Sequence, residues 1–219
     1  MLAVIWKDIM LESRSRETIS ALFVLGLVIL LIFNFAIDVE PANVSRLAPG
    51  MLWIAIVFSA MLGLGRVFVI ERENGCMTAL VLAPVERGSL YLAKLLVNVV
   101  LLLVFEALLL PVFALMFGLD LSAYIVNLIV VLGAGSLGLA AAGTLFALAA
   151  LGTRARELML PLIVLPLQIP LLIAAVKATD IVMRDGSLAE LGGWGEILVA
   201  FDVIFVTVGW LAFEFISVD

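Results

Sequence analysis

The sequence predicts an all-α membrane protein with six transmembrane helices. Of its 219 residues, 65% are hydrophobic and 14% are charged, whereas soluble domains are nearer half apolar and a quarter charged. A globule of this size cannot hide so much apolar surface in one core. Six apolar stretches are also long enough to cross a bilayer. Together these observations exclude a soluble, a disordered or a disulfide-stapled chain.

Charge and composition also exclude several functions. The net charge is −6, with 12 basic and 18 acidic residues, and nucleic-acid binding needs a basic surface. The chain has no His and a single cysteine, Cys76. An intrachain disulfide is therefore excluded, and we expect no metal site. Without His we also expect no ligated haem, and no catalytic residues stand out.

Residues 1–18 carry an amphipathic pattern with Trp6 on its apolar side. The apolar positions, at helical spacing, are Leu2, Ile5, Trp6, Ile9 and Met10. This pattern predicts a helix lying at the membrane interface. The alternative is a short cytoplasmic tail that only leads into the first span.

The predicted spans follow from the uncharged stretches. The first, residues 19–37, has 19 residues without a charge and would cover roughly 28 Å as a helix. Arg66 interrupts the second. The six spans are predicted at about 19–37, 51–70, 95–117, 124–151, 158–176 and 197–213.

Lysine and arginine predict the orientation. Nine of the twelve lie in the N-terminal tail, in 66–94 and in 153–157. Because basic residues collect on the cytoplasmic side, both termini are predicted to lie in the cytoplasm. We expect a multi-pass protein of the cell membrane, which is the inner membrane in a Gram-negative cell. The 177–195 segment would then face outward, as a plain connection or as a contact for a chaperone.

The longest inward loop, 71–89, has a pattern of its own. Charged and polar residues open it, Gly75 permits a turn, and Pro84 ends a short helix predicted over 76–83. Such a helix is either a docking surface for a soluble partner or part of a solvated connector. The candidate docking residues are Glu71, Arg72, Glu73, Asn74, Gly75, Leu80, Pro84 and Arg87.

Polar residues inside spans are functional candidates, because burying them in lipid is unfavourable. Glu106 is the strongest, and Asn98 and Gln168 are the others. Glu106 either acts in conformational change or proton transfer, or it makes one hydrogen bond to a neighbouring helix.

The last two patterns concern helix shape and packing. Pro161, Pro166 and Pro170 predict a kinked or broken fifth span, which would be either a hinge or a fixed bend. Residues 133–138 read G-x-G-x-x-G but lie within an apolar span, so they do not predict dinucleotide binding. Ala134, Gly138 and Ala142 instead predict close helix packing.

Three segments resemble a known family. The loop reads E-R-E-x-G-x-x-x-x-L-x-L-A-P-V-x-R over 71–87, as in permeases of ABC exporters. RLAPGMLWIA (46–55) and LPLIVLPLQIPLLI (160–173) are similar to the haem exporter protein B family, CcmB, of cytochrome c maturation. The resemblance covers nearly the whole chain.

The resemblance implies the membrane subunit of an ABC-type complex. The chain has no G-x-x-x-x-G-K-[ST] phosphate loop, so ATP would be hydrolysed by a separate cytosolic subunit docked on 71–87. Further implied partners are a haem-handling membrane protein, a periplasmic haem chaperone and a second copy of the chain. The complex would either export haem or release the loaded chaperone. The alternatives are an exporter of lipid, drug or polysaccharide, a scaffold subunit, or an intramembrane enzyme.

Overall fold

The computed structural model describes Trp6 and residues 17–36, 41–73, 87–149 and 156–216. The described part is helical and contains no strand. Six helices in it are long and apolar enough to cross a membrane, which confirms the predicted all-α fold. They are α2 (Glu17–Ala36), α3 (Pro41–Glu73), α5 (Arg87–Phe117), α6 (Ile125–Ala149), α7 (Arg156–Asp185) and α8 (Gly193–Ile216).

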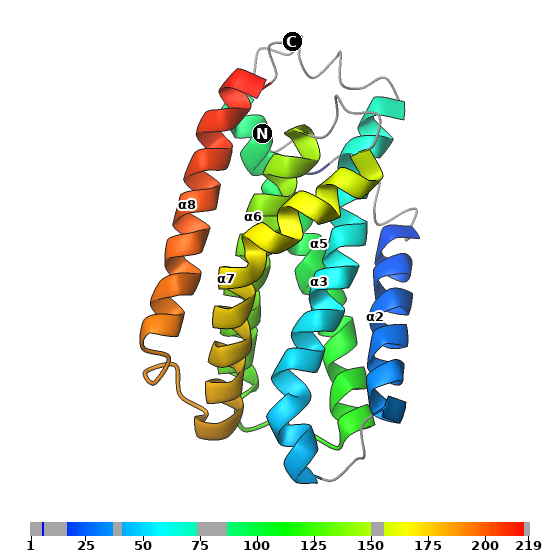
Figure 1. The fold of residues 1–219 in the computed structure, drawn as a ribbon, viewed down its shortest axis with the longest axis vertical. Helices are drawn as coiled ribbons and strands as arrows, with labels where there is room; N and C mark the ends of the chain where they lie inside the picture. The colour runs from blue at the N-terminus through cyan, green and yellow to red at the C-terminus, as the bar shows by residue number, and fades with distance from the viewer. Residues whose placement is uncertain (1–5, 7–16, 37–40, 74–86, 150–155, 217–219) are drawn as a thin grey trace.

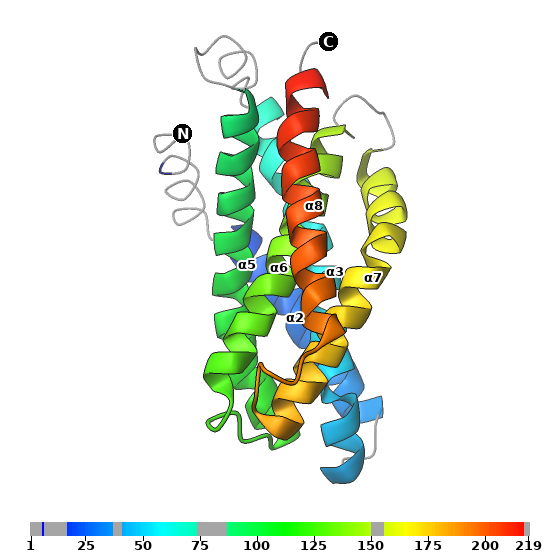
Figure 2. The ribbon, with the colours of Figure 1, turned by 90° about the vertical axis from the view of Figure 1, so that its left-hand side faces the viewer.

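Successive helices run in alternating directions along the long axis (Figures 1 and 2). The end of α3, the start of α5 and the end of α8 therefore lie at one end of the bundle, at the top of Figure 1. The 118–124 and 186–192 connections lie at the other end. We call these the α3-end and the 118–124 end.

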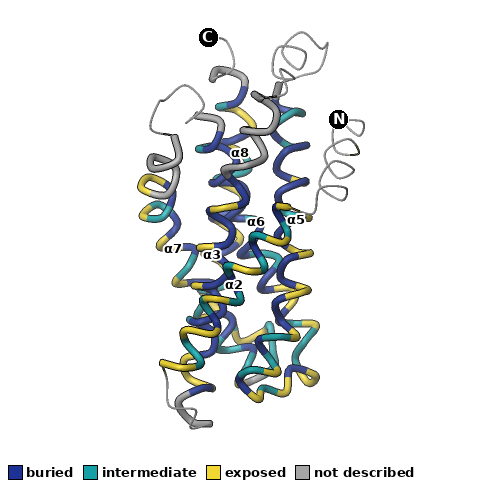
Figure 3. The backbone as a smooth tube through the Cα atoms, turned by 90° about the vertical axis from the view of Figure 1, so that its right-hand side faces the viewer, coloured by how far each residue is buried: buried dark blue, intermediate teal, exposed yellow. Residues whose placement is uncertain are grey.

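The centre of the bundle is formed by α3 and α6. The apolar window of α3 is 72% buried and that of α6 is 56% buried, against 17% for α2 and 28% for α8. α6 packs against α3, α5, α7 and α8, whereas α2 packs against α3 and α5. Figure 3 shows exposed positions on the outer faces, where lipid would cover apolar side chains.

Several helices are longer than predicted, with the largest differences at the start of α3 and the end of α7. α3 begins at Pro41 instead of at residue 51, because proline suits the first position of a helix, where no N–H is needed. Pro49 lies inside α3 without ending it. α7 continues to Asp185, so the first half of the predicted 177–195 loop is helical. Arg184 and Asp180 form an ion pair of 2.8 Å in its last turn.

The predicted loop 71–89 is also shorter than expected. α3 continues through Arg66 to Glu73, and α5 begins at Arg87. Glu71 to Glu73 and Arg87 are therefore at helix ends, and residues 74–86, including the predicted short helix, lie outside the described residues. The predicted interfacial helix lies outside them too, except for Trp6, which is 65% exposed.

α7 is continuous but bent. Figure 1 shows its first part inclined across the bundle and its second part parallel to the long axis. Pro166 and Pro170, both exposed, belong to this helix, and each lacks the N–H that would bond one turn back. The helix is kinked and not broken. Whether it moves as a hinge stays a prediction.

Candidate functional site

Two polar pairs join α5 to α6 inside the bundle. Asn98 Nδ2 donates to Thr144 Oγ1 at 2.8 Å, and Ser136 Oγ donates to a carboxyl oxygen of Glu106. All four side chains are buried. The pairs lie eight residues apart on both antiparallel helices, so they mark two levels about 12 Å apart along one interface.

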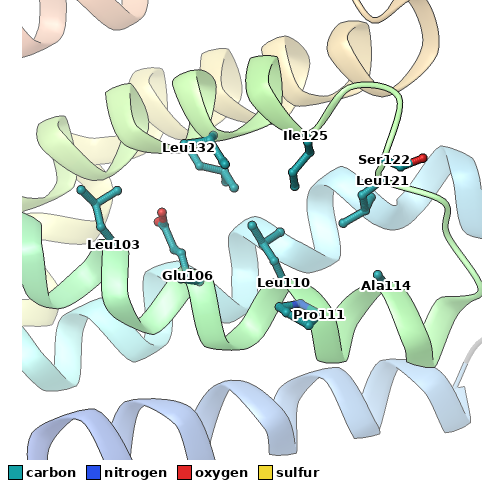
Figure 4. A pocket seen from close by; sticks show the side chains of 11 residues that line it. Leu103, Glu106, Leu110, Pro111, Ala114, Leu121, Ser122, Ile125 and Leu132 are labelled. Atoms are coloured by element: carbon teal, nitrogen blue, oxygen red, sulfur yellow. The ribbon is translucent and has the colours of Figure 1, made fainter.

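Glu106 also lines a groove between α5 and α6. The groove, of about 570 Å³, is lined by α5, by α6 and by the 118–125 segment. We call it the α5–α6 groove. In Figure 4 the Glu106 side chain points from α5 towards α6 between Leu103 and Leu110. Apart from Glu106 and Ser122, the lining side chains are apolar.

Gln168 belongs to a different interface. Its Nε2 donates to the carbonyl oxygen of Leu139 on α6, at 3.2 Å. This hydrogen bond joins α7 to α6. The structure therefore does not bring Gln168 to Asn98 and Glu106.

Three buried oxygen atoms have no hydrogen-bond partner in the described part of the chain. They are Oδ1 of Asn98, Oε1 of Gln168 and Oδ1 of Asp202. Asp202, on α8, is 8% exposed. A Cβ built on Gly138 would lie 2.7 Å from its Oδ1 and 2.8 Å from Leu171 of α7. Gly138 thus allows α7 and α8 to approach α6 closely.

Sequence reasoning missed Ser136 and Thr144, and it missed that the Asp202 side chain is buried. Serine and threonine are common in apolar helices and carry no signal alone. One signal was available, however. Asn98 and Glu106 are eight residues apart on one span, and Ser136 and Thr144 are eight apart on the next. In antiparallel neighbours this equal spacing predicts pairing.

The 46–55 segment contributes a packing centre. Trp53 is 1% exposed and donates from Nε1 to Thr179 Oγ1 of α7 at 2.8 Å. Its ring lies against Gly135 of α6, where an added Cβ would be 2.8 Å from Cζ2. Trp53 therefore ties α3, α6 and α7 together.

At the α3-end, the start of α5 is tied to α8. The Tyr91 hydroxyl lies 3.1 Å from the carbonyl oxygen of Ala141 and 3.2 Å from that of Phe205. Its ring packs on Gly209. Gly88, one residue after the start of α5, packs on the Trp210 indole. A movement of the first turns of α5 would therefore be transmitted to α8.

Two polar residues, Asp120 and Ser122, are exposed at the 118–124 end. Asp120 accepts hydrogen bonds from the Ser122 backbone N–H at 3.0 Å and its hydroxyl at 2.7 Å. These bonds, opposed by slight desolvation, hold the pKa of the Asp120 carboxyl below its usual value. In the described residues, no group of three His, Cys, Asp or Glu side chains is placed to hold a metal ion.

In the described part of the chain, six helices long and apolar enough to cross a membrane, with buried polar pairs between them, define a multi-pass membrane protein. The chain belongs to the CcmB protein family, whose profile matches residues 1–216. It is 31% identical over 178 residues to heme exporter protein B of Paracoccus denitrificans, covering 81% of each chain. It is 34% identical over 189 residues to heme exporter protein B of Pseudomonas aeruginosa, covering 86% of this chain and 82% of the relative.

Proposed function

We propose that the chain is the membrane subunit of an ABC-type haem-export complex that serves cytochrome c maturation. The observation that carries this is the family match over residues 1–216. Relatives covering most of the chain carry the name heme exporter protein B. The six spanning helices agree with a permease.

The energy for transport comes from a separate cytosolic ATPase, because this sequence has no phosphate loop. The ATPase docks on Glu71 to Arg87, at the α3-end. In support, Glu73 ends α3 and Arg87 begins α5, so a force on the segment between them acts on both helices.

The α3-end faces the cytoplasm, with both termini on that side. The distribution of Lys and Arg supports this orientation. Nine of the twelve lie in the N-terminal tail, in 66–94 and in 153–157, and basic residues collect on the cytoplasmic side of a membrane. The membrane is the cell membrane, which is the inner membrane of a Gram-negative cell.

The remaining partners are a second copy of this chain, a haem-handling membrane protein and a periplasmic haem chaperone. Haem is held by the haem-handling membrane protein and the chaperone, since this chain has no His to ligate it. The complex either moves haem or uses ATP to release the loaded chaperone.

Two measurements test this function. A tagged full-length chain should co-purify with an ATPase subunit from its own membrane, and capture of no ATPase would contradict the proposal. Deletion of the gene should abolish haem-stained holo-cytochrome c, and the wild-type gene should restore it. If the level of holo-cytochrome c stayed normal after deletion, the remaining interpretation would be an exporter of another substrate.

The docking segment is tested by two substitutions, each of which removes one negative charge, at opposite ends of the helical bundle. Glu73→Ala should lower the amount of captured ATPase several-fold while the level of membrane-inserted chain stays unchanged. Glu190→Ala removes the same charge at the 118–124 end and should capture as much ATPase as the wild type. Equal capture by both variants would show that the ATPase binds elsewhere.

A further inference from the structure

The α5–α6 groove is open to the lipid-facing side of the bundle. Leu103 and Ile129, which flank it on the two helices, are 37% and 52% exposed. Glu106 lies eleven residues before the end of α5, about 16 Å along the helix. The groove therefore runs from the 118–124 end into the membrane interior, and a membrane-dissolved molecule can enter it sideways.

Glu106 brings a hydrogen-bonding side chain into the apolar part of the groove. Its carboxyl group receives a hydrogen bond from Ser136 at one oxygen. Ser122, from the 118–125 segment, is the other polar side chain of the lining. In the interior of a membrane no bulk water is present to satisfy the remaining acceptor capacity of the carboxyl group.

We infer that this groove binds a neutral, apolar molecule that carries a hydroxyl group, such as an alkylphenol, drawn from the membrane. A hydroxyl group both donates and accepts hydrogen bonds, so it matches the Glu106 carboxyl group in either protonation state. The volume of about 570 Å³ falls in the usual range of about 300 to 1,000 Å³ for small-molecule sites.

Other ligand classes match the lining less well. It contains no Lys or Arg, so an anionic molecule, including one with two carboxylates, would meet a carboxyl group without a balancing cation. A charged amine would lose its hydration within the membrane. A pure hydrocarbon would leave the Glu106 carboxyl group without a hydrogen-bonding partner from the ligand. The inference is thus independent of the proposed function and assigns the groove to a ligand other than the cargo.

Photolabelling tests the inference. The full-length chain, with the subunits that co-purify, is placed in nanodiscs of phosphatidylethanolamine and phosphatidylglycerol. It is labelled with a diazirine-tagged alkylphenol or with the same tagged alkylbenzene lacking the hydroxyl. Mass spectrometry gives the fraction of adducts on residues 103–132. The phenol should label this region about fivefold to tenfold more than the hydrocarbon, the ratio that one hydrogen bond provides.

Three variants make the test specific. Ile129→Trp fills the groove from its exposed rim and should remove the excess labelling. Ile173→Trp places the same ring on a comparably exposed position of α7, 48% exposed, and should preserve it. Glu106→Leu should lower phenol labelling to the hydrocarbon level. Equal labelling by the two probes in the wild type, or an excess that survives Ile129→Trp, would overturn the inference.

Discussion

The ring of Tyr91 on α5 packs directly on Gly209 of α8. A Cβ built on Gly209 would lie 2.7 Å from Cε2 of Tyr91 and nearer still to Cζ. The Tyr91 ring is fully buried and also lies 6.0 Å from the Phe213 ring. This contact joins the helix after the proposed docking segment to the last helix of the chain.

Gly209→Ala should destabilise the protein. The buried ring has no room to retreat, so α8 must move away, and such overpacking costs about 1 to 3 kcal/mol. The melting temperature of the purified chain in detergent reports the loss. Gly50→Ala is the control, because nothing lies within 4 Å of a Cβ there and alanine favours a helix. A Gly209→Ala protein as stable as Gly50→Ala would contradict the packing.

Gly138→Ala should separate α7 and α8 from α6. The added Cβ would fall 2.7 Å from Asp202 Oδ1, and we expect a loss of about 1 to 3 kcal/mol of stability. Gly133→Ala, on the same helix, is the matched control, because its nearest neighbour is 4.0 Å away. Detergent melting curves should show the loss in the first variant only.

The Glu106–Ser136 hydrogen bond should appear as a coupling free energy. A double-mutant cycle of Glu106→Ala and Ser136→Ala, measured by unfolding in SDS, should give about 0.6 to 1.7 kcal/mol, the range for hydrogen bonds between membrane helices. The mismatched cycle of Glu106→Ala with Thr144→Ala should give about zero. A cycle that shows no difference between the two pairs would argue against the bond.

Thr179→Val should leave the indole N–H of Trp53 buried without its acceptor. The variant keeps the shape of the side chain, so the expected loss of about 1 to 3 kcal/mol comes from the unpaired donor. Thr207→Val, at an exposed position of α8, should change the melting temperature little. The Trp53 interpretation fails if both variants melt alike.

Hydropathy alone predicted the number and order of the helices, because each span depends only on its own apolar length. The limits of the spans were less predictable. Residues 41–50 contain Arg46 and Pro49, which suggest a loop, but α3 includes them. Arg46 is exposed, and the buried Trp53 further along fixes the same helix. Packing against the rest of the bundle thus keeps α3 continuous through residues that the local pattern would place in a loop.

The site was predictable only in part. Glu106 and Asn98 stood out because they are polar within apolar runs, and both are buried. Their partners Ser136 and Thr144 depend on which helices are neighbours, and single residues do not reveal that. The groove depends on Pro111 and on the path of the 118–125 segment, neither of which residue types alone specify.

The glycines of α6 restrict how this bundle can change shape. Gly135 receives Trp53 and Gly143 receives Leu64, both from α3, while Gly138 receives Leu171 from α7. Each large side chain occupies the space left by one glycine. If α3 or α7 slid along α6 by one residue, that side chain would collide with the Cβ of the residue next to the glycine. The register between these helices is therefore locked. During transport, these three helices must therefore either flex at their proline-bearing stretches or turn together as one unit.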